Sequence, residues 1–212
     1  VTTIDGSGWF IDDSYYTFND GRVRDVSVAA NATFNAPALN SMNKTRVDIA
    51  AGGVFSAPQL NQMTFGWIRL TDATAELDTA AMTNIDNTAI HVSNGAKFGV
   101  SEGNLAATTY NLTGYRYQRY TFLDADGLGS ELDLSSVVNF NAGWNDSDGN
   151  QYVTTIAARN GGIIDLSGVQ TLTTPSRGED RIDFTTSTGG AINLDGLTTI
   201  VGNGEAFFTV PV

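Results

Sequence analysis

The stretches LDLSSVVNF (Leu132–Phe140), IDLSGVQTL (Ile164–Leu172) and INLDGLTTI (Ile192–Ile200) carry one phrase three times. FNAPALNSM (Phe34–Met42) and FSAPQLNQM (Phe55–Met63) follow the same pattern earlier in the chain. In every copy the first, third, sixth and ninth residues are apolar or small, and a shorter apolar alternation precedes most copies. The chain therefore repeats a unit of short strands joined by corners. Units of this kind stack on one another as the coils of a solenoid.

The repeat lengthens along the chain. Counting weaker copies that begin at Ala75 and Phe98, successive phrases start 20 to 23 residues apart in the first half, and then 34, 32 and 28 residues apart. We expect the additional residues at about 106–119, 141–152 and 173–180. Inserts at one phase of a solenoid leave from one edge, and loops on a rigid scaffold commonly carry function. The spacing thus predicts a wall of three loops beside the C-terminal half.

Residues 1–25 do not follow the repeat. We interpret them as an N-terminal cap, because the first coil of a solenoid has unpaired strand edges that bulky side chains can cover. A ligand-binding role is the alternative for this segment. Residues 26–212 form the repeat region, and the 212 residues are predicted to make one domain. The aromatic residues that suggest the cap are Trp9, Phe10, Tyr15, Tyr16 and Phe18.

The composition excludes several classes of function. A net charge of −12 disfavours nucleic-acid binding, and no apolar run is long enough to predict membrane insertion. The absence of cysteine excludes disulfides and thiolate chemistry. An acidic, lysine-poor, cysteine-free chain favours a bacterial protein that is secreted or displayed on the cell surface. The chain begins at Val1 without a leader, and residues 207–212 still have a strand pattern, so we expect it to be part of a longer polypeptide.

Aromatic and arginine side chains concentrate in the first two inserts. Aromatic faces stack on sugar rings, and arginine donates paired hydrogen bonds to carboxylates or sulfates. These residue types indicate a binding site for a polysaccharide or cell-surface glycan, although the tyrosines alternatively pack the loop onto the coil. The candidate ligand-binding residues are Tyr110, Tyr115, Arg116, Tyr117, Arg119, Trp144 and Tyr152.

Closely spaced carboxylates indicate a weaker candidate site, for a structural calcium ion. Asp124 and Asp126 lie in LDADGLGSEL, and Asp146 and Asp148 lie in NDSDGN. Oxygen ligands around a glycine turn suit Ca²⁺, but neither stretch has a complete twelve-residue calcium loop, and Asp-Gly and Asn-Gly are also ordinary turn sequences. We expect no required cofactor, and any calcium would hold the loop rather than perform chemistry.

Other polar residues have plainer interpretations. Asp133, Asp165 and Asn193 recur at the second place of successive phrases, where they predict a ladder that either keeps the strands soluble or resembles the acid pair of a glycosidase. His91 alternates with inward residues and should point outward. The Thr-Thr pairs do not all fall at one phase, which disfavours a regular ice-binding array. A salt-bridge cluster is expected in the third insert among Arg177, Glu179, Asp180 and Arg181.

The phrases GSELDLSSVVNF, GGIIDLSGVQTL and GGAINLDGLTTI resemble the parallel β-helix repeats of large secreted bacterial surface proteins, both adhesin-like and carbohydrate-active. The resemblance covers about residues 26–202. It implies an all-β, single-domain parallel β-helix of about seven coils with three short strands each. The APALNSM and APQLNQM copies also resemble leucine-rich solenoids, but the chain lacks their regular asparagine ladder and helical segments. No catalytic residues of these families map onto the chain.

The sequence favours a non-catalytic extracellular module that binds glycan or mediates adhesion through the insert wall. The first alternative is a polysaccharide lyase or glycoside hydrolase that uses Arg119 or Tyr117 with Asp146 and Asp148. The second is a structural stalk segment of a large surface protein, in which the inserts have no ligand.

Overall fold

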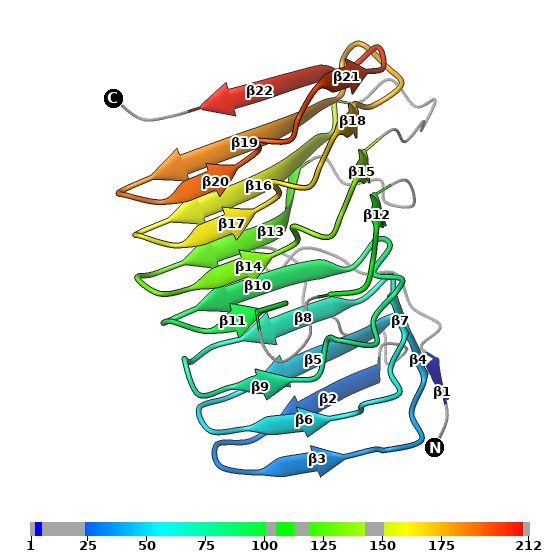
Figure 1. Ribbon diagram of the computed structural model, residues 1–212, viewed down its shortest axis with the longest axis vertical. Coiled ribbons are helices and arrows are strands. Elements are labelled where there is room, and N and C mark those ends of the chain that lie inside the picture. Colours follow the sequence, from blue (N-terminus) through cyan, green and yellow to red (C-terminus); the bar gives the residue numbers. More distant parts are fainter. Residues whose placement is uncertain (1–2, 6–23, 101–104, 113–118, 143–150, 210–212) are drawn as a thin grey trace.

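The computed structural model describes residues 3–5, 24–100, 105–112, 119–142 and 151–209. These residues form an all-β structure without helices, and all its strand pairings are parallel. The strands stack in layers along the long axis of the molecule (Figure 1). Along the described ranges there is also no helix long and apolar enough to cross a bilayer.

The longest sheet has eight strands in sequential order. Its strands alternate inward apolar residues with outward polar ones, as Val47 and Ile49 alternate with Arg46 and Asp48 in β5. The strands are β2 (Arg24–Val28), β5 (Thr45–Ile49), β8 (Trp67–Leu70), β10 (Ala89–Ser93), β13 (Arg119–Asp126), β16 (Val153–Arg159), β19 (Arg181–Ser187) and β22 (Glu205–Thr209).

A second set of strands comprises two sheets. It contains β3 (Thr33–Asn35), β6 (Val54–Ser56) and β9 (Glu76–Leu77) in one sheet, and β11 (Lys97–Phe98), β14 (Glu131–Asp133), β17 (Ile163–Asp165) and β20 (Ala191–Asn193) in the other. The third set contains β1 (Thr3–Asp5), β4 (Ser41–Asn43) and β7 (Gln62–Thr64), and then β12 (Thr109–Asn111), β15 (Asn139–Asn141), β18 (Thr171–Thr173) and β21 (Thr199–Val201).

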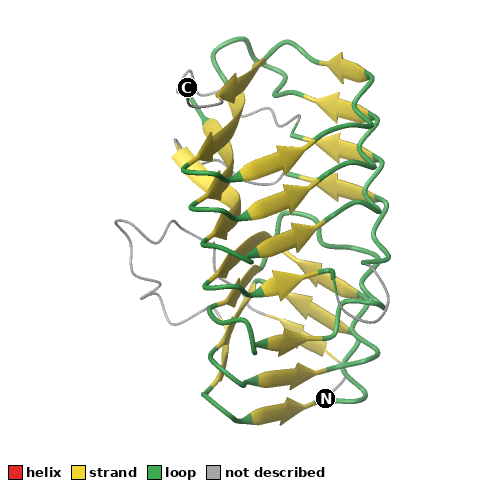
Figure 2. Cartoon of the chain, turned by 60° about the vertical axis from the view of Figure 1, so that its left-hand side comes forward, coloured by secondary structure: helices red, strands yellow, loops and turns green. Residues whose placement is uncertain are grey.

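The chain visits the eight-stranded sheet, the second set and the third set in that order, and then begins again. We call one such pass a coil. The strands of one set lie above one another in Figure 2. Corresponding residues pair directly between coils, so Leu132 pairs with Ile164, and Phe140 pairs with Leu172. A chain that places one short strand in each set per coil builds every sheet from parallel neighbours.

The four apolar places of the phrase form the core, as the sequence predicted. In the coils that begin at Phe55, Leu132 and Ile164, all of these side chains are at most 1% exposed. Burial of large aliphatic and aromatic side chains contributes about 1.5–3 kcal/mol each. The last coil is less covered, because it has a neighbouring coil on one side only. Ile192 is half-buried and Ile200 is 50% exposed.

Corners are fixed by backbone conformation and by short polar side chains. Asn160 and Gly161 both have positive φ at the corner between β16 and β17, a conformation that Asn and Gly tolerate best. The expected ladder of Asp133, Asp165 and Asn193 is present in register. Each Oδ1 accepts a backbone N–H two residues later, at 2.8–3.0 Å. These side chains therefore stabilise the corners of the coils.

The insert boundaries differ from those expected. Thr109–Asn111 forms β12, and Tyr110 pairs with Phe140, so this part of 106–119 belongs to the repeat. The sequence prediction was wrong there because the phrase that begins at Phe98 is longer than the others. At the N-terminus, Thr3–Asp5 pairs with β4, whereas the five aromatic residues of the expected cap lie outside the described residues.

Candidate functional site

In the second half of the chain, three long connections join the third set of strands to the eight-stranded sheet. They are residues 112–118 between β12 and β13, 142–152 between β15 and β16, and 174–180 between β18 and β19. After β4 and β7, in the first half of the chain, the same connection is short: Lys44 alone joins β4 to β5, and residues 65–66 join β7 to β8. Residues 6–23, between β1 and β2, make a longer connection of this phase. The long connections therefore share one phase of the coil, as the sequence predicted.

Most of the predicted ligand-binding residues belong to these connections. Tyr115, Arg116, Tyr117 and Trp144 lie outside the described residues. Arg119 is the first residue of β13 and pairs through its backbone with Val153. The structure consequently places the backbone of Arg119 directly after the first long connection, next to the start of β16.

Tyr110 and Tyr152 occupy different surroundings from those expected of ligand-binding residues. The Tyr110 side chain is 0% exposed, its ring packs 5.2 Å from that of Phe140, and its hydroxyl donates to the Thr88 carbonyl at 2.6 Å. Burial raises the pKa of Tyr110 well above its ordinary value of 10.0. Tyr152 is 5% exposed. Neither ring offers an open face to a sugar: Tyr110 packs in the core, and Tyr152 is buried.

Asp180 anchors the third connection. Its side chain is fully buried, and its Oδ1 accepts the backbone N–H of Tyr152 at 2.9 Å. Its backbone carbonyl accepts the N–H of Glu205 at 3.1 Å. Of the expected salt bridges, Arg177 pairs with Glu179, whereas Arg181 pairs with Asp183 of its own strand at 2.9 Å. Asp180, the last residue of the third connection, is therefore held to Tyr152, the last residue of the second.

The outer face of the eight-stranded sheet carries a cluster that the sequence did not single out. Asp48 lies between Arg46 and Arg69, with a nitrogen–oxygen distance of 2.8 Å to each. The two guanidinium groups lie 5.7 and 5.5 Å from the centre of the Trp67 ring, which is 2% exposed. The His91 ring meets the edge of Trp67 at 5.3 Å. Asp48 pairs with Arg69, and Arg69 pairs with His91, in three neighbouring strands. This pairing, which needs the alignment of three coils, is what brings the cluster together.

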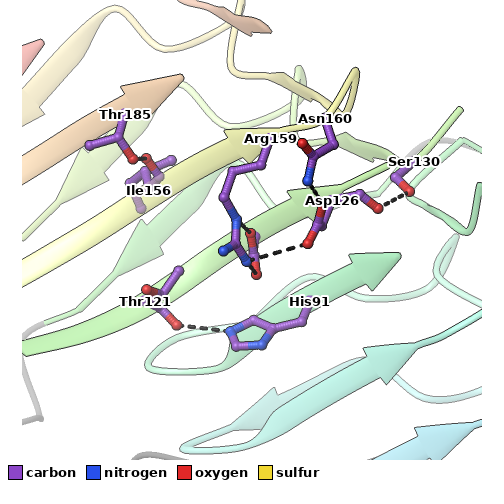
Figure 3. Close-up of polar contacts among 9 residues, drawn as sticks. His91, Thr121, Asp126, Ser130, Ile156, Arg159, Asn160 and Thr185 are labelled. Carbon is purple, nitrogen blue, oxygen red and sulfur yellow. Dashed lines mark hydrogen bonds and ion pairs between the residues drawn. The ribbon is translucent and has the colours of Figure 1, made fainter. Parts of the chain in front are cut away.

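His91 points outward, as predicted, and contacts an irregularity in the sheet. Its Nε2 lies 2.8 Å from the backbone carbonyl of Thr121 (Figure 3). A carbonyl oxygen only accepts hydrogen bonds, so Nε2 carries the hydrogen. The register between β13 and β16 shifts by one residue between Thr121 and Leu123, where Thr121 pairs with Thr155 and Leu123 pairs with Ile156.

Asp124 and Asp126, two of the four candidate calcium ligands, contact a cation and an amide. Arg159 Nε donates to Asp124 at 3.2 Å, and Asn160 donates to Asp126 at 2.7 Å (Figure 3). Arg159 also lies 3.7 Å from Asp126. The other two candidates, Asp146 and Asp148, lie outside the described residues. Within the part of the chain that the structure describes, there is no group of three or more His, Asp or Glu side chains suited to a metal ion.

Comparison with known proteins gives no relative: no family model, no curated protein and no solved structure matches the chain.

Proposed function

We propose that the protein is a parallel β-helix, a solenoid of about seven coils, that acts as a non-catalytic extracellular carbohydrate-binding or adhesion module. In this proposal the protein is bacterial, is secreted or held at the cell surface, and has an aromatic N-terminal cap. The glycan contacts the three long connections, with Tyr115, Arg116, Tyr117, Arg119 and Trp144 as the binding residues.

The observation that carries this proposal is the common phase of the long connections. Lys44 alone makes the connection in the first complete coil, whereas residues 112–118, 142–152 and 174–180 make it in three successive later coils. Longer connections that recur at one phase of a regular scaffold are typical of a binding surface. The buried contact between Asp180 and Tyr152 supports it, because a fixed base lowers the entropy lost when loops bind a ligand.

Calcium enters the proposal as a structural ion only. Asp146 and Asp148 would hold it in the second connection, where carboxylates flank a glycine in NDSDGN. The carboxylates of Asp124 and Asp126 are engaged by Arg159 and Asn160 and are left out of this set.

The test is retention on a glycan array and on affinity gels that contain soluble polysaccharides, with and without calcium. We expect the Tyr117→Ala/Trp144→Ala double variant to bind at least about tenfold more weakly, a loss of about 1.4 kcal/mol. Leu128→Ala is the control, because Leu128 is 86% exposed at a corner between β13 and β14. Absence of retention, or equal retention of the double variant, contradicts the proposal.

The enzyme alternative suggested by the sequence used Arg119 or Tyr117 with Asp146 and Asp148. A different set of residues, on the outer face of the eight-stranded sheet, favours a second candidate function of the same class. Arg69, His91 and Asp124 are register neighbours there, so a cation, an imidazole and a carboxylate lie side by side. This combination is suited to proton abstraction beside a neutralised acid. Release of unsaturated products from uronic polysaccharides, lost in His91→Gln, would favour a lyase over the binding module.

A further inference from the structure

One face of the molecule has a composition unlike the rest. In seven successive coils the third set presents a triplet whose two flanking residues are half-buried or exposed. The central residue is buried in the first six, whereas Ile200 in the last coil is 50% exposed. We call the flanking residues the ladder face. They are Ser41 and Asn43, Gln62 and Thr64, Asn84 and Asp86, Thr109 and Asn111, Asn139 and Asn141, Thr171 and Thr173, and Thr199 and Val201.

The triplets follow one another without a break in the backbone contacts. β4 pairs with β7, and Gln62 of β7 bridges to Asn84. Asn87, next to the triplet of Asn84, donates its backbone N–H to the Asn111 carbonyl at 2.7 Å, and β12, β15, β18 and β21 then pair in order. The ladder face therefore extends over seven coils, although the strands belong to two sheets.

The ladder face is almost uncharged. Asp86 is the only ionisable residue among these fourteen positions, and none of them is Lys or Arg. β1 adds one more carboxylate residue in the same register, because Asp5 pairs with Asn43. Both oxygens of Asp86 accept hydrogen bonds from Asn111, at 2.9 Å each. The outer face of the eight-stranded sheet, by contrast, carries the guanidinium groups of Arg46, Arg69 and Arg159. The chain as a whole has a net charge of −12, so a face with almost no charge differs from the rest of its surface.

Several side chains of the ladder face are held in place by their neighbours. Thr64 Oγ1 donates to Asn43 Oδ1 at 3.2 Å, and Asn111 Nδ2 donates to Asp86 Oδ2. Such cross-coil bonds fix the rotamers before any ligand arrives, which reduces the entropy lost on binding. The first residue of a triplet is exposed in four coils, at Gln62, Thr109, Asn139 and Thr199.

We infer that the ladder face binds the surface of an ordered, uncharged polysaccharide fibre. Hydroxyl and amide side chains both donate and accept hydrogen bonds, as sugar hydroxyls require. They recur with the strand spacing of about 4.8 Å, a distance comparable with the length of one sugar ring. Each contact is weak, but contacts repeated over seven coils add through multivalency. The face contains no cation that would select a polyanionic glycan. The inference does not rest on the proposed function, although residues 112, 142 and 174, the first residues of the long connections, directly follow triplets of the ladder face.

The test is sedimentation of the whole chain with microcrystalline cellulose and with chitin particles. Two ladder variants, Asn139→Glu/Thr171→Glu and Asn139→Lys/Thr171→Lys, place long charged side chains at two paired positions of the face, of which Asn139 is exposed and Thr171 is half-buried. The matched control is Ile163→Glu/Ala191→Glu, also a register pair, on the second set. We expect both ladder variants to bind at least about tenfold more weakly, and the control and Thr171→Ser to bind normally. Matching unfolding temperatures establish that all variants are folded.

Each contrary result overturns the inference. The inference is overturned if the unsubstituted protein sediments with neither cellulose nor chitin. It is also overturned if the ladder variants sediment to the same extent as the unsubstituted protein. Inhibition of ice recrystallisation without sedimentation would instead assign the ladder face to a water lattice. Tyr117→Ala/Trp144→Ala should still sediment. If Tyr117→Ala/Trp144→Ala fails to sediment while the ladder variants still sediment, the long connections bind the particles. In that case this inference fails and the proposed function stands.

Discussion

The interior coils and the last coil share one phrase but differ in how much of it they bury. Leu172 and Ile200 both occupy the ninth place and pair with each other, yet Leu172 is 1% exposed and Ile200 is 50% exposed. The phrase places a side chain inward, but burial also needs a coil on each side. Stability should therefore be concentrated in the interior coils, as expected for repeats that contact only their neighbours.

The largest test of this difference compares two phenylalanines. Phe140 is 0% exposed in the interior, whereas Phe208 is 48% exposed in the last strand. We expect Phe140→Ala to lower the free energy of unfolding by about 3–5 kcal/mol, and Phe208→Ala to lower it by about 1 kcal/mol or less. Urea denaturation of both variants measures the difference. Equal losses would show that the last coil is as tightly packed as the interior.

A smaller effect is expected at Tyr110, the ninth-place residue of an interior coil. Tyr110→Phe removes the donor to the buried Thr88 carbonyl and should cost about 1–3 kcal/mol. The pKa of Tyr110 is raised on folding, so its stabilising contribution is complete below the unfolded pKa near 10 and is lost at higher pH. Thermal unfolding above pH 10 should therefore depend less steeply on pH in Tyr110→Phe. Identical pH profiles would contradict this account.

The smallest effect compares two corners. Asp165 and Asn193 are register neighbours, and each accepts one backbone N–H at its corner. Asp165→Ala, in an interior coil, should cost about 0.5–1.5 kcal/mol. Asn193→Ala should cost less in global unfolding, because the last coil can open locally. Hydrogen exchange of Ser167 and Asp195 amides, compared with urea denaturation, separates local from global loss.

Periodicity predicted the strands and the interior because both depend on local alternation. It failed at Tyr110 for two reasons. The extra residues after Phe98 shift the ninth place of that phrase to Tyr110. A tyrosine is also suited both to a surface and to a core that contains a partner for its hydroxyl. Arg69, His91 and Asp124 were not grouped because they are far apart in sequence. Only the register between coils shows them to be neighbours.

The candidate calcium ligands illustrate a further limit. Asp124 and Asp126 have the spacing that a cation site needs, but Arg159, one coil later, pairs with both. Sequence spacing describes one coil at a time, whereas the charge around a side chain is set by the coils above and below it. Carboxylates in a stacked structure are therefore better assessed from the residue they face in the next coil.

The long connections leave the register of the eight-stranded sheet almost unchanged. Leu123 pairs with Ile156, and Ile156 pairs with Phe184, although different lengths of chain separate the two pairs. In each coil, the strand of the third set is already paired with its neighbours before the long connection begins. A foreign peptide that replaced residues 143–150 would consequently be held with both ends fixed. The chain is in this sense a natural display scaffold, on which several peptides could be presented side by side at a spacing set by the backbone.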